Sequence, residues 1–135
     1  MQLTKNFWLH EFDCKDGTKV PKEFILNVHR LADNLQVYRD WLNENRGDRP
    51  EYIISVISGW RSYWYNIRVG GALKSYHKKG LASDIVVPGR TPDQVAEDIS
   101  MLIRLGKMEQ GGLGRYNTFT HYDCRGYQAR WDKRK

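Results

Sequence analysis

The sequence predicts a single α+β domain over residues 1–135. A chain of this length can bury one hydrophobic core but is too short for two ordinary domains. One long segment repeats its apolar residues with the period of a helix, while three short segments are rich in β-branched and aromatic residues and are bounded by turn residues. With 40% hydrophobic and 28% charged residues, the composition is typical of a soluble protein.

Helices are expected in four places. From Pro21 to Arg46 the apolar side chains form one stripe at the 3.6-residue period, which predicts the longest helix. Thr91-Pro92-Asp93-Gln94 is typical of a capping box, so a second helix should begin there. Shorter helical segments are expected at residues 7–12, whose aromatic side chains should pack on the core, and at residues 63–69.

Strands are expected where β-branched and aromatic residues cluster. Tyr52–Ile57 should form a buried strand, and Ile85–Val87 should form a second one with Asp84 at its start. Phe119–Arg125 is expected to be the third strand and the last element. The segment Gly111-Gly112-Leu113-Gly114 is expected to loosen the backbone, and it lacks the spacing of a phosphate-binding loop.

The third predicted strand separates two groups of side chains. Alternation places His121 and Asp123 on one face and Tyr122 and Cys124 on the other. This pattern argues against Cys124 as a nucleophile beside the histidine. Cys14 and Cys124 are the only cysteines, too few for a disulfide scaffold and without zinc-finger spacing, so both are expected to be free thiols.

Basic residues are concentrated near the C-terminus. Lys and Arg number 22 against 16 Asp and Glu, and the excess lies between Arg115 and Lys135. Such an excess favours a polyanionic partner, either nucleic acid or an anionic cell wall, although a solvated tail is the simplest interpretation. No apolar run approaches the roughly 18 residues of a membrane helix, and charges interrupt the N-terminal segment before a signal-peptide core could form. Neither membrane insertion nor export by a signal peptide is expected.

His77 and Asp84 form the first half of a candidate metal site. Gly80 lies between them and allows a positive φ, so the chain could fold His77 back towards Asp84. A surface histidine and a turn aspartate remain an alternative for this segment alone. His121 offers a further ligand, and two imidazoles with one carboxylate suffice for a catalytic zinc site that keeps a fourth position open.

Several motifs occur together along the chain. They are Ser58-Gly59-Trp60-Arg61-Ser62, Ser75-x-His77-x-x-Gly80-x-Ala82-x-Asp84, Gly111-Gly112-Leu113-Gly114, His121-x-Asp123, and Arg125-Gly126 through Ala129-Arg130-Trp131. Together they resemble peptidase family M15, the zinc D-Ala-D-Ala carboxypeptidases and peptidoglycan endopeptidases, and in particular its short single-domain branch of bacteria and phages.

The resemblance implies both a fold and a set of site residues. The fold would be a small antiparallel sheet with helices packed on one side. One zinc ion would be held by His77, Asp84 and His121. Arg61 would hold a substrate carboxylate or polarise the scissile carbonyl, and Ser75 would bond to a ligand or the substrate, or else cap its loop.

The sequence departs from many relatives at the general base. They often carry an acidic residue three positions before the second metal histidine, or a histidine two positions before it. Thr118 and Phe119 occupy these positions here, and neither can take a proton at neutral pH. Asp123 is the candidate replacement as a catalytic base, although it could instead orient His121, or close the site as a fourth ligand.

The sequence is compatible with three functions. The leading one is a zinc-dependent peptidase that hydrolyses peptide stems or cross-links of bacterial peptidoglycan, acting as a monomer at the cell wall in phage lysis or on a virion. The alternative is a zinc-stabilised module that binds wall peptides without cleaving them. A nucleic-acid binder using Trp60, Tyr63, Trp64 and Tyr65 as stacking platforms ranks last, because these aromatics are expected to pack beside the site, so no nucleic-acid partner is expected.

Overall fold

The computed structural model describes residues 1–135 and contains both helices and strands, as the α+β prediction requires. In chain order the elements are the 3-10 turns η1 (Leu9–Phe12) and η2 (Lys22–Phe24), helix α1 (Ile25–Glu44), strand β1 (Ser55–Ser58), helix α2 (Tyr63–Arg68), the 3-10 turn η3 (Tyr76–Lys79), strand β2 (Ala82–Val86), helix α3 (Pro92–Arg104), and strands β3 (Gly112–Arg115), β4 (Thr120–Asp123) and β5 (Ala129–Asp132).

The five strands form one mixed sheet in the order β1-β2-β4-β3-β5. The pairs β1–β2, β2–β4 and β3–β4 are antiparallel, whereas β5 runs parallel to β3. The expectation of an antiparallel sheet is therefore correct for every pair except this last one. The short connection after β4 makes the chain return in the opposite direction, and because β3 also opposes β4, β5 must run parallel to β3.

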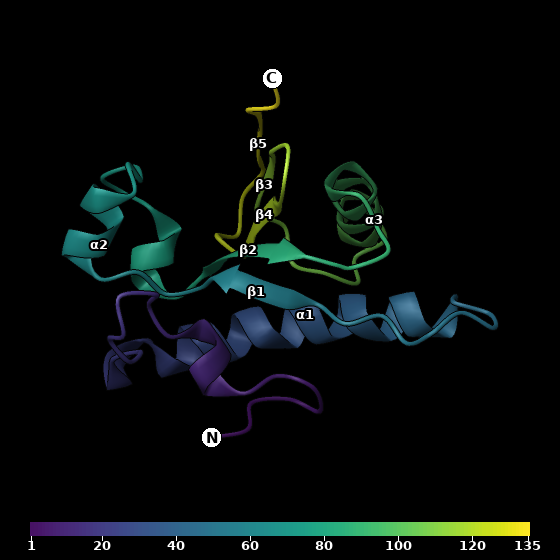
Figure 1. The fold of residues 1–135 in the computed structure, drawn as a ribbon, viewed down its shortest axis with the longest axis horizontal. Coiled ribbons are helices and arrows are strands. Elements are labelled where there is room, and N and C mark those ends of the chain that lie inside the picture. Colours follow the sequence, from purple (N-terminus) through teal and green to yellow (C-terminus); the bar gives the residue numbers. More distant parts are fainter.

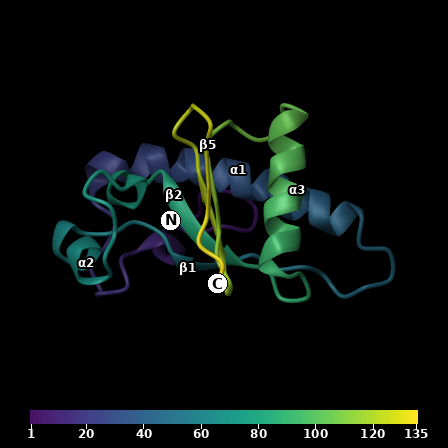
Figure 2. The same cartoon turned by 90° about the horizontal axis from the view of Figure 1, so that it is seen from above.

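Two helices cover one face of the sheet. Figures 1 and 2 show α3 on one side of the C-terminal strands and α2 on the other, with α1 running beneath β1 and β2. The hydrophobic core joins α1 and α3 to the sheet, and Leu35, Ile99, Ile85, Leu113 and Tyr122 are among its buried members. The prediction of helices on one side thus describes α1 and α3, while α2 lies on the opposite side.

The helices agree with the sequence predictions. The capping box at the start of α3 is present, because Gln94 N donates to Thr91 Oγ1 at 3.1 Å and Thr91 N donates to Gln94 Oε1 at 2.9 Å. Phe7 and Phe12 are buried around η1, as expected, but Trp8 is exposed, so the expectation that the aromatic residues of this segment pack on the core is wrong for Trp8. A stripe of apolar residues in α1 faces the core, which confirms the helix predicted between Pro21 and Arg46.

The strand predictions need three corrections. β1 is shorter than predicted, lies at an edge of the sheet, and is covered on one face only, since Ile53 and Ile57 are exposed while Ile54 and Val56 are buried. Residues 112–115, expected to be loose backbone, form the strand β3 between β4 and β5. Residues 129–132 form β5, although Phe119–Arg125 was expected to be the last element.

Gly114 in β3 leaves room for a large side chain from the neighbouring strand. The indole of Trp131, from β5, lies over Gly114 so closely that a β-carbon there would overlap the ring. Glycine lowers intrinsic strand propensity, so the sequence of β3 does not indicate a strand by itself.

The aromatic residues near α2 have two different environments. Trp60 is buried, stacks on Phe24, and donates its indole N–H to the Lys78 carbonyl at 3.1 Å. Tyr63 and Trp64 are exposed, Trp64 to 73%, so the expectation that they pack beside the site is wrong for these two.

Two further expectations concern the cysteines and the membrane. Cys14 and Cys124 are both buried and free, which confirms that they form no disulfide. None of the helices combines the length and the apolar character that crossing a membrane requires.

Candidate metal centre

His77 is placed by the turn η3. Ser75 caps this turn, since its hydroxyl accepts a hydrogen bond from His77 N at 3.2 Å. Gly80 ends the turn with a φ of +76°, a left-handed conformation that favours glycine. The sharp reversal brings the buried imidazole of His77 over β2, as the spacing of the sequence motif predicts.

Asp84 and His121 are placed by strand register. Asp84 lies in the middle of β2, not at its start, and is paired directly with His121 in β4. Residues that pair directly on adjacent strands project from the same face of the sheet. Their neighbours Ser83 and Tyr122, also paired, project from the opposite face towards the core.

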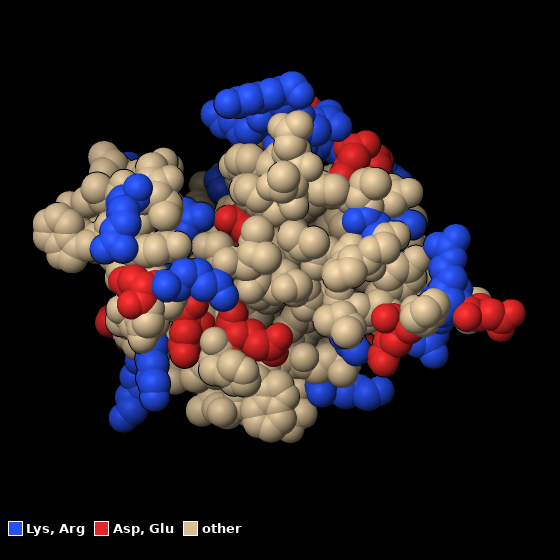
Figure 3. Space-filling view, in the orientation of Figure 1, with Lys and Arg blue, Asp and Glu red and all other residues tan.

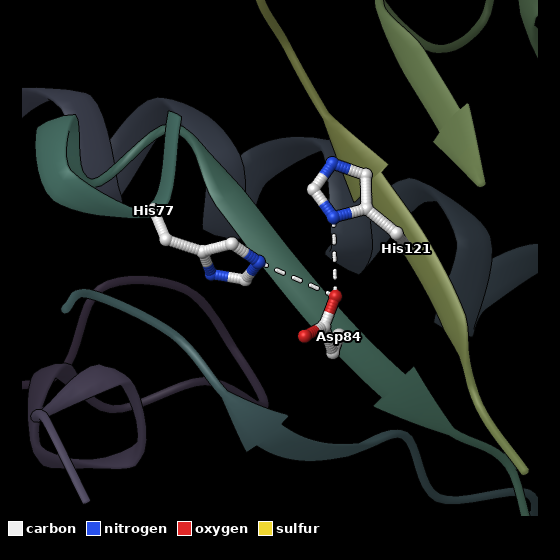
Figure 4. A group of neighbouring side chains, drawn as sticks. All are labelled: His77, Asp84 and His121. Atoms are coloured by element: carbon white, nitrogen blue, oxygen red, sulfur yellow. Dashed lines mark hydrogen bonds and ion pairs between the residues drawn. The ribbon is translucent and has the colours of Figure 1, made fainter. Parts of the chain in front are cut away.

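The three side chains converge on one point (Figure 4). His77 Nε2 lies 3.3 Å from Asp84 Oδ1, and His121 Nδ1 lies 3.1 Å from the same oxygen. The three ligand atoms all lie within 4.8 Å of one another, and all three residues are buried. A tetrahedral zinc ion with bonds of about 2.0–2.1 Å separates its ligands by roughly 3.3–3.4 Å, so the cluster has suitable dimensions.

Both imidazoles are oriented by partners on their far sides. His77 Nδ1 donates to the Gly59 carbonyl at 2.8 Å, and His121 Nε2 donates to Asp123 Oδ2 at 2.7 Å. Because these partners accept, each ring can direct the lone pair of its other nitrogen towards Asp84. With neutral imidazoles, two nitrogen lone pairs and one carboxylate oxygen point at a common position, and this donor arrangement fits a bound metal ion.

Arg61 fixes the second oxygen of Asp84. Its Nη2 donates to Asp84 Oδ2 at 3.1 Å, Nε donates to Ser58 Oγ at 3.2 Å, and Nη1 donates to Asn66 Oδ1 at 3.3 Å. A guanidinium has five N–H groups, so two remain for another partner. Arg61 also lines the pocket in front of the cluster.

The electrostatic environment keeps the carboxylates ionised. Burial by itself would raise the pKa of Asp84, but the adjacent imidazoles of His121 and His77 lower it further and leave the pKa below its ordinary value. Burial would likewise raise the pKa of Asp123, but Arg125 and His121 lower it further than burial raises it. Burial is the largest effect on His77 and lowers its pKa. Burial would also lower the pKa of His121, but Asp123 and Asp84 raise it further, so the pKa lies above its ordinary value. An ionised Asp84 and a neutral His77 are ready for a metal ion, whereas a metal ion at His121 has to displace a proton.

A pocket of about 910 Å³ opens in front of the cluster. Figure 3 shows the surface hollowed between α2 and the C-terminal strands, with Lys and Arg gathered at the C-terminal end. Asp84 is the only acidic residue of the lining. The basic residues of the lining are Arg61, Lys74, Arg125, Lys133 and Lys135.

The structure brings most of the predicted site residues together. His77, Asp84 and His121 form the cluster, Arg61 adjoins it, and Ser75 lines the pocket while capping η3. Asp123 lies behind His121 and away from the pocket. The loop residue Phe119 lines the pocket, where its ring stacks on Tyr116.

Two residues near the cluster were missed as site residues by sequence reasoning. Arg125 pairs with Asp123, and Trp131 packs on His121 with ring centroids 4.8 Å apart. The alternation that placed His121 and Asp123 on one face extends to Arg125 and could have indicated it. Trp131 could be recognised as a site residue only once the position of β5 in the sheet is known.

Two histidines and one aspartate around a position facing a pocket are the donor set of a mononuclear zinc hydrolase. The sequence matches the family described as Peptidase M15 over residues 5–123. The chain therefore belongs to this family of zinc-dependent metallopeptidases. No curated protein sequence matches the chain.

Proposed function

We propose that the protein hydrolyses peptide bonds in the stems or cross-links of bacterial peptidoglycan, with one zinc ion held by His77, Asp84 and His121. The convergence of these three donors at one end of a basic pocket is the observation that carries the proposal. Zinc in such a site polarises a carbonyl and lowers the pKa of a bound water to about 7.

The residues around the cluster have separate tasks in this proposal. Arg61 holds Asp84 in place and directs its two remaining N–H groups at a carboxylate or carbonyl oxygen of the substrate. Ser75 holds the turn that carries His77, and its place in the pocket lining lets it contact the substrate as well.

The charge of the pocket supports an anionic peptide as substrate. Lys74 lies on one side of the pocket, after α2, while Lys133 and Lys135 lie on the other side, after β5. These lysines have no acidic partner within ion-pair distance. Peptidoglycan stems carry free carboxylates, which these unpaired lysines would attract.

For Asp123 we propose the orienting role in preference to the catalytic base. The carboxylate is completely buried, and it accepts hydrogen bonds from His121, Arg125 and Gly112 N. With these bonds in place it cannot reach a proton in the pocket. The pocket lining contains no other carboxylate besides Asp84, so a substrate group or water chain would have to accept the proton.

This lack of a base favours a second candidate, a zinc-stabilised module that binds wall peptides without cleaving them.

The enzyme and the module can be distinguished by incubating the purified, zinc-loaded protein with soluble peptidoglycan fragments, followed by mass spectrometry. The enzyme predicts cleavage that a chelator abolishes and added zinc restores. Release of a single C-terminal residue indicates a carboxypeptidase, and larger fragments indicate an endopeptidase. Binding of the fragments without cleavage at full zinc occupancy would instead support the module.

A further inference from the structure

Arg125 lies where the two histidine-bearing segments meet. Its Nε donates to Asp123 Oδ1 at 2.8 Å, and its Nη2 donates to Asp123 Oδ2 at 2.8 Å. The same Oδ2 accepts the hydrogen bond from His121 Nε2. A paired, two-point contact of this kind fixes the plane of the carboxylate, and the carboxylate in turn fixes the plane of the imidazole.

The same guanidinium also contacts the other segment. Its central carbon lies 4.3 Å from the ring centroid of Tyr76, the residue before His77 in η3. Tyr127 and Trp131 lie 5.6 and 5.5 Å away, and the hydroxyl groups of Tyr76 and Tyr127 are 2.8 Å apart. Arg125 therefore occupies an aromatic cage that includes a residue of the His77 turn.

These contacts require an arginine. Asp123 is completely buried, and a buried carboxylate that loses its cationic partner is strongly destabilised. Lysine could supply the charge, but it lacks the planar fork that engages both carboxylate oxygens and the flat surface that stacks on Tyr76.

We propose that Arg125 is a positioning residue for the metal centre. Through Asp123 it orients His121, and through Tyr76 it holds the turn that carries His77, so that two segments distant in the sequence present their nitrogens at one point. The proposal rests on the proposed function, since it takes the cluster to be a metal site. Arg125 does not itself touch the three ligand atoms.

The first test is the zinc dissociation constant, measured by competition with a chromophoric chelator. Arg125→Ala is expected to weaken zinc binding about 10- to 100-fold, as is usual for residues that orient metal ligands. Arg125→Lys should recover only part of this loss. The matched control is Arg115→Ala, which removes an arginine paired with Asp93 and Glu97 outside this pocket, and which should stay within about two-fold of the unmodified protein.

Substitutions of Tyr76 test the contact between its ring and the guanidinium of Arg125. Tyr76→Phe keeps the ring and should bind zinc nearly as well as the original protein, whereas Tyr76→Leu should weaken binding about 3- to 10-fold. These variants, with Arg125→Lys, also decide the question if Arg125→Ala does not fold. The proposal is overturned if Arg125→Lys and Tyr76→Leu both bind zinc within two-fold of the unmodified protein, or if Arg115→Ala loses as much affinity as Arg125→Ala.

The second test needs no metal and separates this inference from the proposed function. In the metal-free protein, the Nε2 proton of His121 should exchange slowly with water, and NMR should show faster exchange in Arg125→Lys but not in Arg115→Ala. If the unmodified protein binds no zinc, the proposed function fails, while slow exchange that depends on Arg125 still supports the positioning role. Equal protection in both variants would refute it.

Discussion

Leu113 and Gly114 are neighbours in β3, yet they face opposite sides of the sheet. Leu113 is paired with Tyr122 and belongs to the core formed with α1 and α3. Gly114 is paired with His121 and is covered by Trp131, on the side of the metal cluster. The core face consists mainly of apolar side chains, while the site face consists of glycines, ion pairs and oriented imidazoles.

Side chains alternate between the two faces along each strand, so the residues that stabilise the fold lie on one face and the residues that could bind a metal lie on the other. Hydrophobic burial on the core face provides most of the folding free energy. On the site face, buried charges contribute little net stability, because the cost of removing them from water offsets their attraction. Variants at neighbouring positions on the two faces should therefore differ in whether they change zinc affinity or stability.

Removal of a ligand should have the largest effect. Asp84→Asn is expected to weaken zinc binding by more than the roughly 100-fold typical of residues behind the ligands, because the anionic donor is lost. Ser83→Ala, the neighbour on the core face, should leave zinc affinity unchanged. Chelator competition measures both, and circular dichroism confirms that each variant is folded. Equal zinc affinity in the two variants would contradict the assignment of Asp84.

A substitution on the core face should lower the free energy of unfolding and leave zinc affinity unchanged. Leu113→Ala is expected to reduce the free energy of unfolding by about 2–5 kcal/mol, because it leaves a cavity in a packed core. The zinc affinity of the folded variant should remain near that of the original protein. Urea denaturation of the metal-free protein measures the first quantity. A large loss of zinc affinity without a loss of stability would show that the two faces are not separate.

Asp123→Asn should weaken zinc binding by about 10- to 100-fold. An amide oxygen in the place of Oδ2 could accept from His121 and Arg125 Nη2, but the amide NH2 would then replace Oδ1 and face two other donors, Gly112 N and Arg125 Nε. Asp132→Asn is the control, since that exposed carboxylate pairs with Arg134 away from the cluster. If Asp123 were the catalytic base, peptide hydrolysis would fall while zinc affinity stayed constant.

Gly114→Ala should disturb Trp131, because a β-carbon at this position would overlap the indole. Overpacking of this kind destabilises a protein by about 1–3 kcal/mol. Since Trp131 packs on His121, the tryptophan emission and the zinc affinity should both change. An unchanged emission spectrum and an unchanged affinity would show that the indole does not support the site.

The smallest effect concerns Cys124, which is buried with the core. Burial raises the pKa of its thiol to about 12, so the reactive thiolate should be scarce at pH 8. Iodoacetamide should modify Cys124 in the folded protein far more slowly than in urea, and the rate should rise as the pH approaches 12. Mass spectrometry of the labelled peptide measures this, and rapid labelling at pH 8 would show that the core face is open to water.

The His77 turn could be predicted from the sequence because its signals are local. Gly80 and the β-branched residues after Asp84 lie within a few residues of His77, and the structure contains the expected turn and strand. Strand β3 could not be predicted in this way, because Gly112 and Gly114 have low strand propensity. They belong in a strand only because β4 and Trp131 lie beside them.

Arg125 illustrates the same limit within the site. In the sequence it contributes to the basic C-terminal region and belongs to a motif shared with peptidase family M15, but neither feature gives it a role at the metal centre. Its contact with Asp123 could be inferred from alternation, but its contact with Tyr76 joins residues 49 positions apart.

The sequence by itself determined the family, the two long helices, the turn at Gly80 and the residues able to bind a metal, because each of these depends on side-chain chemistry or on neighbours within one or two turns of chain. The tertiary structure alone decided that β5 runs parallel to β3, that glycines form a strand beneath Trp131, and that Arg125 connects two distant segments. These features depend on which strands pair and in which register, and pairing is a property of residues that are close in space but far apart along the chain.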